Sequence, residues 1–361
     1  MTEKWSEKKK AIDRFHIFLL IFGAARLLAI GFSEFPEQSV QSFYKEALFY
    51  FSFFSFSFYL KSFDETSRKI ILYLFIAGGI IAAIVGILRF NLSIVERAES
   101  FSSGYATFST YLLMVLAVVL STIRFKSKIK AFGFYYVIAT VIILTGIITS
   151  LGRANLAIAV LLLIISFFLF RIKLVYAPGI IIITGLLVYI SFFNNSIQVE
   201  QRIESPVQLS DRDIIYEGAS EIAFEHPFLG YGPRTFREIF PFPERFADKG
   251  IGSWHNDLLE MYFEGGAVGL LTYLLMIIGI YTVILRFILK NKTQTEDNFI
   301  LEGILLSLTG LYLSAFVAGF INSPVLSVVF AFLVSFAGSI IFQRDHKQRS
   351  EIEPGSEATV N

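Results

Sequence analysis

Long apolar runs separated by short polar connections dominate the pattern of this chain. A membrane-spanning helix needs about 20 predominantly apolar residues, and segments of this kind recur along almost the whole sequence. They lie near residues 14–32, 43–60, 70–89, 107–123, 131–150, 154–170, 174–193, 257–285, 299–320 and 325–342. The pattern predicts an all-α polytopic membrane protein with about ten transmembrane helices.

The second apolar run contains a stretch that imitates a β-strand. From Phe51 to Phe58, phenylalanine and serine nearly alternate, which is the periodicity of a strand. An open strand in lipid would leave its backbone N–H and C=O groups without partners. The length of the run and its apolar flanks therefore favour a helix.

Basic residues mark one side of the predicted membrane. Connections on the cytoplasmic side of membrane proteins carry an excess of Lys and Arg. If the N-terminus is cytoplasmic, every connection on that side is basic, whereas the short outer connections contain only Arg89, Arg97 and Arg153. We expect both termini in the cytoplasm, the chain in the cytoplasmic (inner) membrane, and residues 194–256 on the extracytoplasmic side.

The outer connection 194–256 is too long, at about 60 residues, to be a simple linker. Ser210-x-x-Asp213 is similar to a capping box, and apolar residues from Ile214 to Ala223 recur at helical spacing. Gly230-Tyr-Gly-Pro233 predicts turns. We divide the chain into an N-terminal bundle of seven helices (1–193), an extracytoplasmic loop with short helices (194–256), three C-terminal transmembrane helices (257–342) and a disordered cytoplasmic tail (343–361).

Composition supports the membrane assignment and excludes several kinds of chemistry. Of the 361 residues, 55% are hydrophobic and only 17% are charged, against roughly 25% charged residues in soluble proteins. The absence of cysteine excludes disulfides, thiolate nucleophiles and cysteine-based metal sites. The net charge is +1, and the basic residues are concentrated in particular connections between the apolar runs. The charge therefore gives no reason to expect a nucleic-acid partner.

His255 and Asn256 stand at the start of the eighth predicted span, on its outer side. A helix N-terminus can hold phosphate or pyrophosphate. A neutral imidazole there can take a proton from a sugar hydroxyl, because its reference pKa is about 6.5. Asp257 and Glu260 are near enough in sequence to orient it. A Trp254-His-Asn helix cap without chemistry explains the same residues equally well.

Arginines supply further candidates. Arg153 and Arg212 lie at the outer side, and guanidinium groups bind phosphate bidentately; a snorkelling Arg153 and a solvated Arg212 are the structural alternatives. Arg89 and Arg234 would extend a cationic funnel, although arginines at such positions are more often interface anchors. Arg26, in the middle of the first span, is a functional candidate by default, for which the sequence names no partner.

Other reaction classes lack their motifs. The sequence contains no P-loop, no G-x-S-x-G and no H-E-x-x-H. In the long outer connection, Asp211 and Asp213 flank Arg212, and we assign them to the helix cap. No other carboxylate cluster stands on an outer loop, which argues against a metal-dependent transferase. We expect neither a metal nor a cofactor.

Taken together, these residues resemble a known family. His255-Asn256, nine residues and then Gly266-Ala-Val-Gly269 reproduce the H-[N/S/Q]-x9-G-x-x-G pattern of the O-antigen ligases. The stretch from Arg212 through His226–Pro233 is similar to the loop of the wider O-antigen ligase and polymerase superfamily. Ser150–Leu156 resembles its arginine-bearing helix entry, with R-x2-L where the family often has R-x3-L. The resemblance covers about residues 140–285, and many relatives have twelve spans.

The resemblance implies a metal-independent glycosyltransferase whose donor is a glycan on polyprenyl pyrophosphate. The acceptor would be a hydroxyl of another glycan or of a lipid core. His255 would be the general base or orient the acceptor, while Arg153 and Arg212 would bind the pyrophosphate. The remaining expected site residues fall into three groups. Asn256, Trp254, Arg234 and Arg89 would bind substrate; Gly230, Gly232 and Pro233 would form turns; Gly266 and Gly269 would permit close helix packing.

Within this family the motifs leave two activities open. A ligase and a polysaccharide polymerase, of O-antigen or teichuronic type, use the same residue types. A transporter or flippase of lipid-linked sugars belongs to another class. It predicts internal repeats and polar residues spread through several helices, and neither is clear in the sequence.

Overall fold

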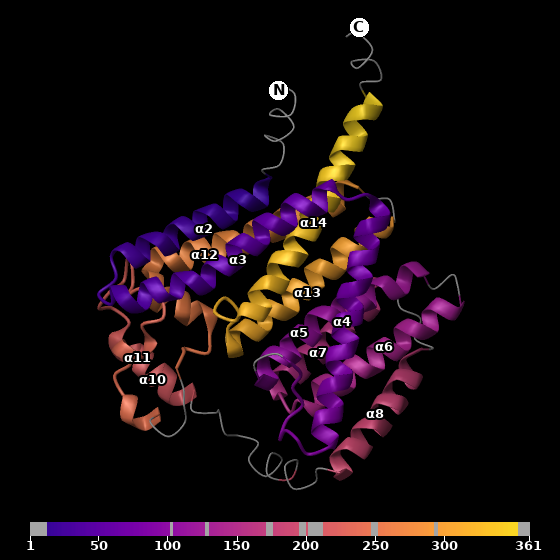
Figure 1. Cartoon of the computed structure of the whole chain (residues 1–361), viewed down its shortest axis with the longest axis horizontal. Helices are drawn as coiled ribbons and strands as arrows, with labels where there is room; N and C mark the ends of the chain where they lie inside the picture. The colour runs from indigo at the N-terminus through magenta and orange to yellow at the C-terminus, as the bar shows by residue number, and fades with distance from the viewer. Residues whose placement is uncertain are drawn as a thin grey trace.

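The computed structural model describes residues 13–101, 104–126, 130–170, 176–194, 200, 212–246, 252–291 and 295–352, and all regular structure within them is helical (Figure 1). The ten long helices are α2 (Arg14–Gly31), α3 (Pro36–Ser62), α4 (Glu65–Asn91), α5 (Gly104–Lys126), α6 (Lys130–Thr149), α7 (Arg153–Phe170), α8 (Tyr176–Asn194), α12 (Asp257–Lys290), α13 (Glu296–Ala318) and α14 (Pro324–Ile352). Two short helices, α10 (Arg212–Ile222) and α11 (Phe236–Ile239), and a 3₁₀ turn (Pro243–Phe246) lie between α8 and α12. The expected all-α architecture is confirmed.

Each of the ten apolar runs forms one long helix. Seven of these helices are long and apolar enough to cross a membrane. Helix α3, although 27 residues long, is not among them, and in α6 and α7 the apolar stretches within the described residues are shorter, Phe134–Thr149 and Arg153–Phe168. Of the ten predicted transmembrane helices, seven thus meet the requirement over the described residues. The seventh-to-eighth connection carries the short helices, as expected. The chain is a multi-pass membrane protein.

The phenylalanine–serine stretch is helical, as the lipid argument requires. In α3 the side chains of Ser52 and Ser57 are buried, whereas Phe51 and Phe58 are largely exposed. The helix packs its serine-bearing face along α14, where Ser335 donates to the backbone oxygen of Phe53 at 3.2 Å. Small polar residues permit this close approach of two helices.

One helix lies at the centre of the bundle. All residues from Leu112 to Leu120 of α5 are buried, as expected for a helix that is apolar on every side. It packs against α13, α6 and α7, while α2 lies along α12 and α3 along α14 (Figure 1). Peripheral α8 exposes Ile181, Ile182 and Leu186, which suits contact with lipid.

The segment between α8 and α12 has a small core of its own. Helix α10 buries Ile215, Gly218, Ala219 and Ile222, which is the apolar face predicted from the sequence. They pack with Tyr231, Phe236, Phe240, Trp254 and Phe263. The cap predicted at Ser210 lies outside the described residues. This second core attaches α10 and α11 to the start of α12.

The predicted disordered tail is wrong for residues 343–352. Helix α14 continues to Ile352. Gln343 donates to the backbone oxygen of Phe63 at 2.6 Å, and Arg344 pairs with Asp297 at 2.9 Å. These contacts stabilise the helical turn that contains Gln343 and Arg344. The helix therefore continues beyond the point where the apolar residues end. Residues 353–361 lie outside the described part.

Helix α12 is interrupted at Gly266, and a loop fills the interruption. In a regular helix the N–H groups of Ala267 and Val268 would donate four residues back, to Phe263 and Glu264. Here they donate to the carbonyls of Pro227 and Phe228, at 2.8 and 3.2 Å. We call residues 226–234 the inserted loop.

The inserted loop also satisfies the carbonyls on the other side of the break. Tyr231 N donates to Phe263 O at 2.8 Å, and Gly232 N donates to Glu264 O at 3.1 Å. Four backbone groups that the break would leave unpaired therefore find partners in the loop, which is what a buried backbone requires.

The glycines of both motifs serve this insertion. Gly266 has φ 61° and ψ −159°, a region that is essentially restricted to glycine, and a Cβ atom there would overlap the backbone of Phe228. Gly230 and Gly232 have φ 67° and 104°, which confirms the predicted turns. The expectation that Gly266 and Gly269 serve helix packing is wrong. At Gly269 a Cβ would lie 2.9 Å from Met261 O of the same helix, so both glycines accommodate the break.

We expect Gly266→Ala to destabilise the protein by about 3 kcal/mol, because it combines a forbidden backbone conformation with overpacking. The control is Gly265→Ala, since a Cβ at the neighbouring Gly265 meets nothing within 4 Å. Detergent-induced unfolding followed by tryptophan fluorescence measures both. Equal stabilities of the two variants would contradict the insertion.

Candidate active site

His255 and Arg212 come together where α12 begins. Arg212 is the first residue of α10 and donates its Nη2 to Val317 O at 2.8 Å. His255 is half-buried, with Nδ1 3.5 Å from Ser253 Oγ. Burial and the positive charge of Arg212 both lower the pKa of His255 below its ordinary value of 6.5. The pair is therefore a neutral imidazole beside a fixed cation.

The two neighbours of His255 hold it in place. Trp254 is 1% exposed and stacks on Phe263 with ring centroids 4.1 Å apart. Asn256 caps α12, its Oδ1 accepting from Leu258 N at 2.9 Å. His255 itself has φ 49°, in the left-handed region that histidine and asparagine tolerate better than most residues.

These positions bear on two of the residues that we expected to bind substrate. The indole of Trp254 has no surface to offer a ligand, because it forms the core beneath the site. Asn256 uses its side-chain oxygen for the helix cap, as in the alternative interpretation of Trp254-His-Asn. The cap and the candidate chemistry thus coexist: Trp254 lies in the core, Asn256 caps the helix, and the half-buried imidazole of His255 carries the candidate chemistry.

The end of α13 fixes the starts of three other helices. Val317 O accepts from Arg212 of α10. Phe320 N donates to Asp257 Oδ1 of α12 at 3.0 Å, and Ser314 Oγ donates to Asn155 Oδ1 of α7 at 2.9 Å. We call residues 314–320 the α13 hub. This hub anchors the starts of α7, α10 and α12. The three predicted catalytic residues lie at these starts: Arg153 and Arg212 begin α7 and α10, and His255 directly precedes the cap of α12.

Arg153 begins α7 and its side chain is exposed. The first turn of this helix is tied down by Asn155, whose Nδ2 donates to Ser109 Oγ at 2.6 Å and Thr110 Oγ1 at 3.1 Å. The α13 hub thus lies against the start of α7 as well as against Arg212. That Arg153 shares a substrate with His255 stays a prediction.

Arg89 is engaged within its own connection. Its Nη1 donates to Ser100 O at 2.7 Å, and its Nη2 lies 3.8 Å from Glu99. Ala98 N in turn donates to Thr149 O at the end of α6. Arg89 thus holds together the connection after α4, and the hydrogen bond of Ala98 attaches this connection to α6. Substrate binding by Arg89 stays a prediction.

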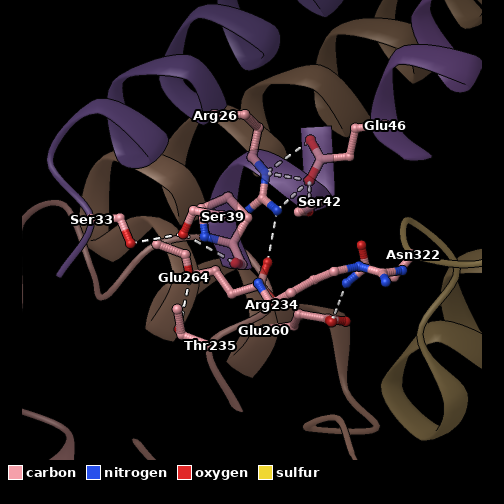
Figure 2. Close-up of polar contacts among 12 residues, drawn as sticks. Arg26, Ser33, Ser39, Ser42, Glu46, Arg234, Thr235, Glu260, Glu264 and Asn322 are labelled. Carbon is pink, nitrogen blue, oxygen red and sulfur yellow. Dashed lines mark hydrogen bonds and ion pairs between the residues drawn. The ribbon is translucent and has the colours of Figure 1, made fainter. Parts of the chain in front are cut away.

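Arg234 closes the inserted loop. Its backbone N–H donates to Glu264 Oε1 at 2.7 Å (Figure 2), and it has φ 60°. The preceding Pro233 accepts from Ser39 Oγ at 3.2 Å. Arg234 Nε is buried without a hydrogen-bond partner among the described residues. The backbone of Arg234 is thus structural, and a substrate contact of its side chain stays a prediction.

Arg26 has partners that the sequence could not name. Its guanidinium, 1% exposed, lies between Glu46 at 2.5 Å and Glu264 at 2.7 Å (Figure 2). The three residues come from α2, α3 and α12. Because Glu264 also accepts from Arg234 N, this network joins the inserted loop to the first helix pair. The only sequence signal was the charge of Arg26 within an apolar run.

The carboxylates of α12 do not orient His255, contrary to expectation. Asp257, Glu260 and Glu264 are spaced three and four residues apart, which places them on one helix face, and that face is buried. Asp257 accepts from Tyr273 at 3.0 Å and from Phe320 N, and Glu260 accepts from Asn322. Within the described residues, no group of three or more His, Asp and Glu side chains is arranged to hold a metal ion.

We expect Arg26→Gln to cost about 3–5 kcal/mol of stability, because it leaves two carboxylates buried without their counter-ion. Arg89→Gln is the control. Its ion pair is partly exposed and 3.8 Å long, and pairs of this kind contribute about 0–1 kcal/mol. Detergent unfolding compares the two variants, and similar losses in both would show that the Arg26 network is not a stabilising centre.

Comparison with known proteins adds family information. Residues 138–274 match the family model described as O-Antigen ligase. No curated protein matches the chain. The matched stretch runs from α6 into α12 and includes Arg153, Arg212, His255 and the inserted loop. Over these residues the resemblance seen in the sequence is confirmed, and this stretch of the chain is similar to the O-antigen ligase family.

Proposed function

We propose that this protein is a glycosyltransferase that moves a saccharide from polyprenyl pyrophosphate to an acceptor sugar hydroxyl, in the manner of an O-antigen ligase. The family match supports a membrane glycan enzyme of the O-antigen ligase or polymerase type. The observation that carries the proposal is the pairing of His255 with Arg212 at the start of α12. A base and a cation at one place suit the transfer of a sugar from an anionic leaving group.

In the proposed reaction His255 is the general base. In the tautomer that the reaction requires, Nδ1–H donates to Ser253 Oγ, 3.5 Å away, and the lone pair of Nε2 receives the acceptor proton. As the acceptor oxygen forms its bond to the anomeric carbon, the bond from that carbon to the pyrophosphate oxygen breaks. The electron pair of the broken bond stays on the pyrophosphate, which remains attached to its carrier lipid. Attack from the opposite face inverts the anomeric configuration. General base catalysis of this kind contributes about 10²–10⁴-fold.

Arg212 stabilises the departing pyrophosphate. Within the described residues one of its N–H groups is used, toward Val317 O, and a guanidinium has five. The others are available for phosphate oxygens, and a fixed cation is most effective where negative charge develops. Arg153 is the proposed second cation. These side chains supply the positive charge that a metal would otherwise provide, so we propose a reaction without metal or cofactor.

The surroundings suit a lipid-linked donor. Phe224, between α10 and the inserted loop, is 88% exposed, and Phe228 within the loop is 75% exposed. Aromatic side chains of this kind settle at membrane interfaces. With the orientation expected from the basic connections, this face meets the extracytoplasmic leaflet, so that carrier lipid and acceptor reach His255 from the same surface.

We expect His255→Asn to lower glycan transfer by at least 100-fold while leaving the fold intact. Asparagine tolerates the left-handed backbone of position 255 and cannot act as a base. The measurement is transfer of a polyprenyl-pyrophosphate-linked saccharide in membranes. Asn256→Asp, which preserves the helix cap, is the control and should retain folding and most activity. Normal transfer by His255→Asn would remove the base assignment.

The pH dependence of His255 tests its pairing with Arg212. Because burial and then the neighbouring cation disfavour the imidazolium, the folded pKa of His255 lies below 6.5. His255 is therefore neutral and reactive above that pKa, and loses this form as the pH falls through it. Removing the charge in Arg212→Gln should raise the pKa and shift the acidic limb to higher pH, whereas Arg212→Lys should leave it near its wild-type position.

This measurement does not require activity. Diethyl pyrocarbonate modifies neutral imidazole, and peptide mass spectrometry reports the modified fraction of His255 at each pH. Identical titration curves for Arg212→Gln and Arg212→Lys would show that the two residues do not interact.

A further inference from the structure

A second polar feature lies at the opposite end of α12. An open hollow of about 560 Å³ lies where the start of α2 meets the ends of α12 and α14. Helix α12 is 34 residues long, or about 50 Å at 1.5 Å per residue. The hollow is therefore far from His255 and is separate from the proposed active site.

The rim of the hollow is rich in cations. Arg14 at the start of α2 and Arg286 and Lys290 near the end of α12 line it, and all three side chains are exposed. None of them has an ion-pair partner among the described residues. His346 of α14 completes this side of the rim.

Two carboxylates also line the hollow, and they do not cancel its charge. Asp13 is paired with Lys61 at 2.8 Å and hydrogen-bonded to His16 at 2.8 Å. Asp345 is exposed on α14. Three cations thus face one carboxylate that has no counter-ion among the described residues. This excess of positive charge favours an anionic ligand.

The walls of the hollow are apolar. Phe15, Ile17, Val283, Phe287, Ile341 and Phe342 line it. Ile17 is 50% exposed, and Leu20 and Ile21, which lie one turn further along the same face of α2, are also exposed. The apolar surface thus continues from the hollow along a predicted membrane span.

We propose that this hollow binds an anionic phospholipid of the cytoplasmic leaflet. Its phosphate would lie among Arg14, Arg286 and Lys290, and its acyl chains would follow α2. Basic pockets between transmembrane helices on the cytoplasmic side bind anionic head groups, and the basic connections predict that this end faces the cytoplasm. A soluble phosphate would use the cations and leave the apolar wall unused, so the combination favours a lipid.

Two pairs of substitutions separate a specific site from general surface charge. Arg286→Gln with Lys290→Gln removes two cations from the rim. Lys69→Gln with Arg344→Gln removes two cations from the same end of the protein, where they pair with Glu296 and Asp297 outside the hollow. A third variant, Val283→Trp, narrows the hollow and retains every charge.

The measurement is binding of phosphatidylglycerol to the delipidated protein, with phosphatidylcholine as the reference lipid, by native mass spectrometry. We expect the rim pair to bind phosphatidylglycerol about 30-fold more weakly, because each basic group near the membrane surface contributes about 1 kcal/mol. Val283→Trp should also weaken binding. The control pair should bind within about twofold of wild type, and inorganic phosphate should not displace the lipid.

Three results would overturn the proposal. Equal losses in the rim pair and the control pair would indicate general surface charge. Unchanged binding in Val283→Trp would show that the hollow is not used. Displacement of the lipid by millimolar phosphate would identify a site for soluble phosphate instead. Each result is independent of glycan transfer, so it leaves the proposed function untouched.

Discussion

The structure depends on the break in α12 at Gly266 and on the inserted loop that fills it. A helix interrupted inside a membrane protein leaves backbone N–H and C=O groups that water cannot reach, and each would cost several kcal/mol. The loop from Pro227 to Gly232 supplies partners for four of them. In return, the loop acquires a fixed position. The α10–α11 segment is therefore held at the start of α12 by backbone hydrogen bonds as well as by its small aromatic core.

A buried charge network secures the same junction. Arg26, Glu46 and Glu264 are almost fully buried, and burying such charges carries a large desolvation cost that only good geometry offsets. Glu264 satisfies this condition because it accepts from Arg26 with one oxygen and from the Arg234 backbone with the other. The network couples α2 and α3 to the loop, so the first helix pair contributes to the position of His255 without approaching it.

The two ends of α12 have different chemical characters. At its start, a half-buried imidazole lies beside a guanidinium, where we propose proton transfer and stabilisation of a leaving phosphate. At its other end, exposed cations lie above an apolar wall, where we propose that a lipid head group binds. Both proposals bring arginine against phosphate, but only the first requires a proton transfer, which we assign to His255. The distinction between chemistry and binding therefore rests on His255.

The sequence by itself determined the helices and the identity of the candidate site. Apolar periodicity located all ten long helices, because the requirement for about 20 apolar residues is local and does not depend on neighbours. The spacing of His255 and Gly266, with Arg212, was likewise legible from the sequence. Only the tertiary structure decided what these residues touch. It paired Arg26 with carboxylates 20 and 238 positions away, buried Trp254, turned Asp257 and Glu260 away from His255, and made Gly266 a break that receives a loop. The physical reason is that packing between distant segments decides which group becomes the partner of a buried charge or of an unpaired backbone group. Local sequence patterns carry no information about that packing.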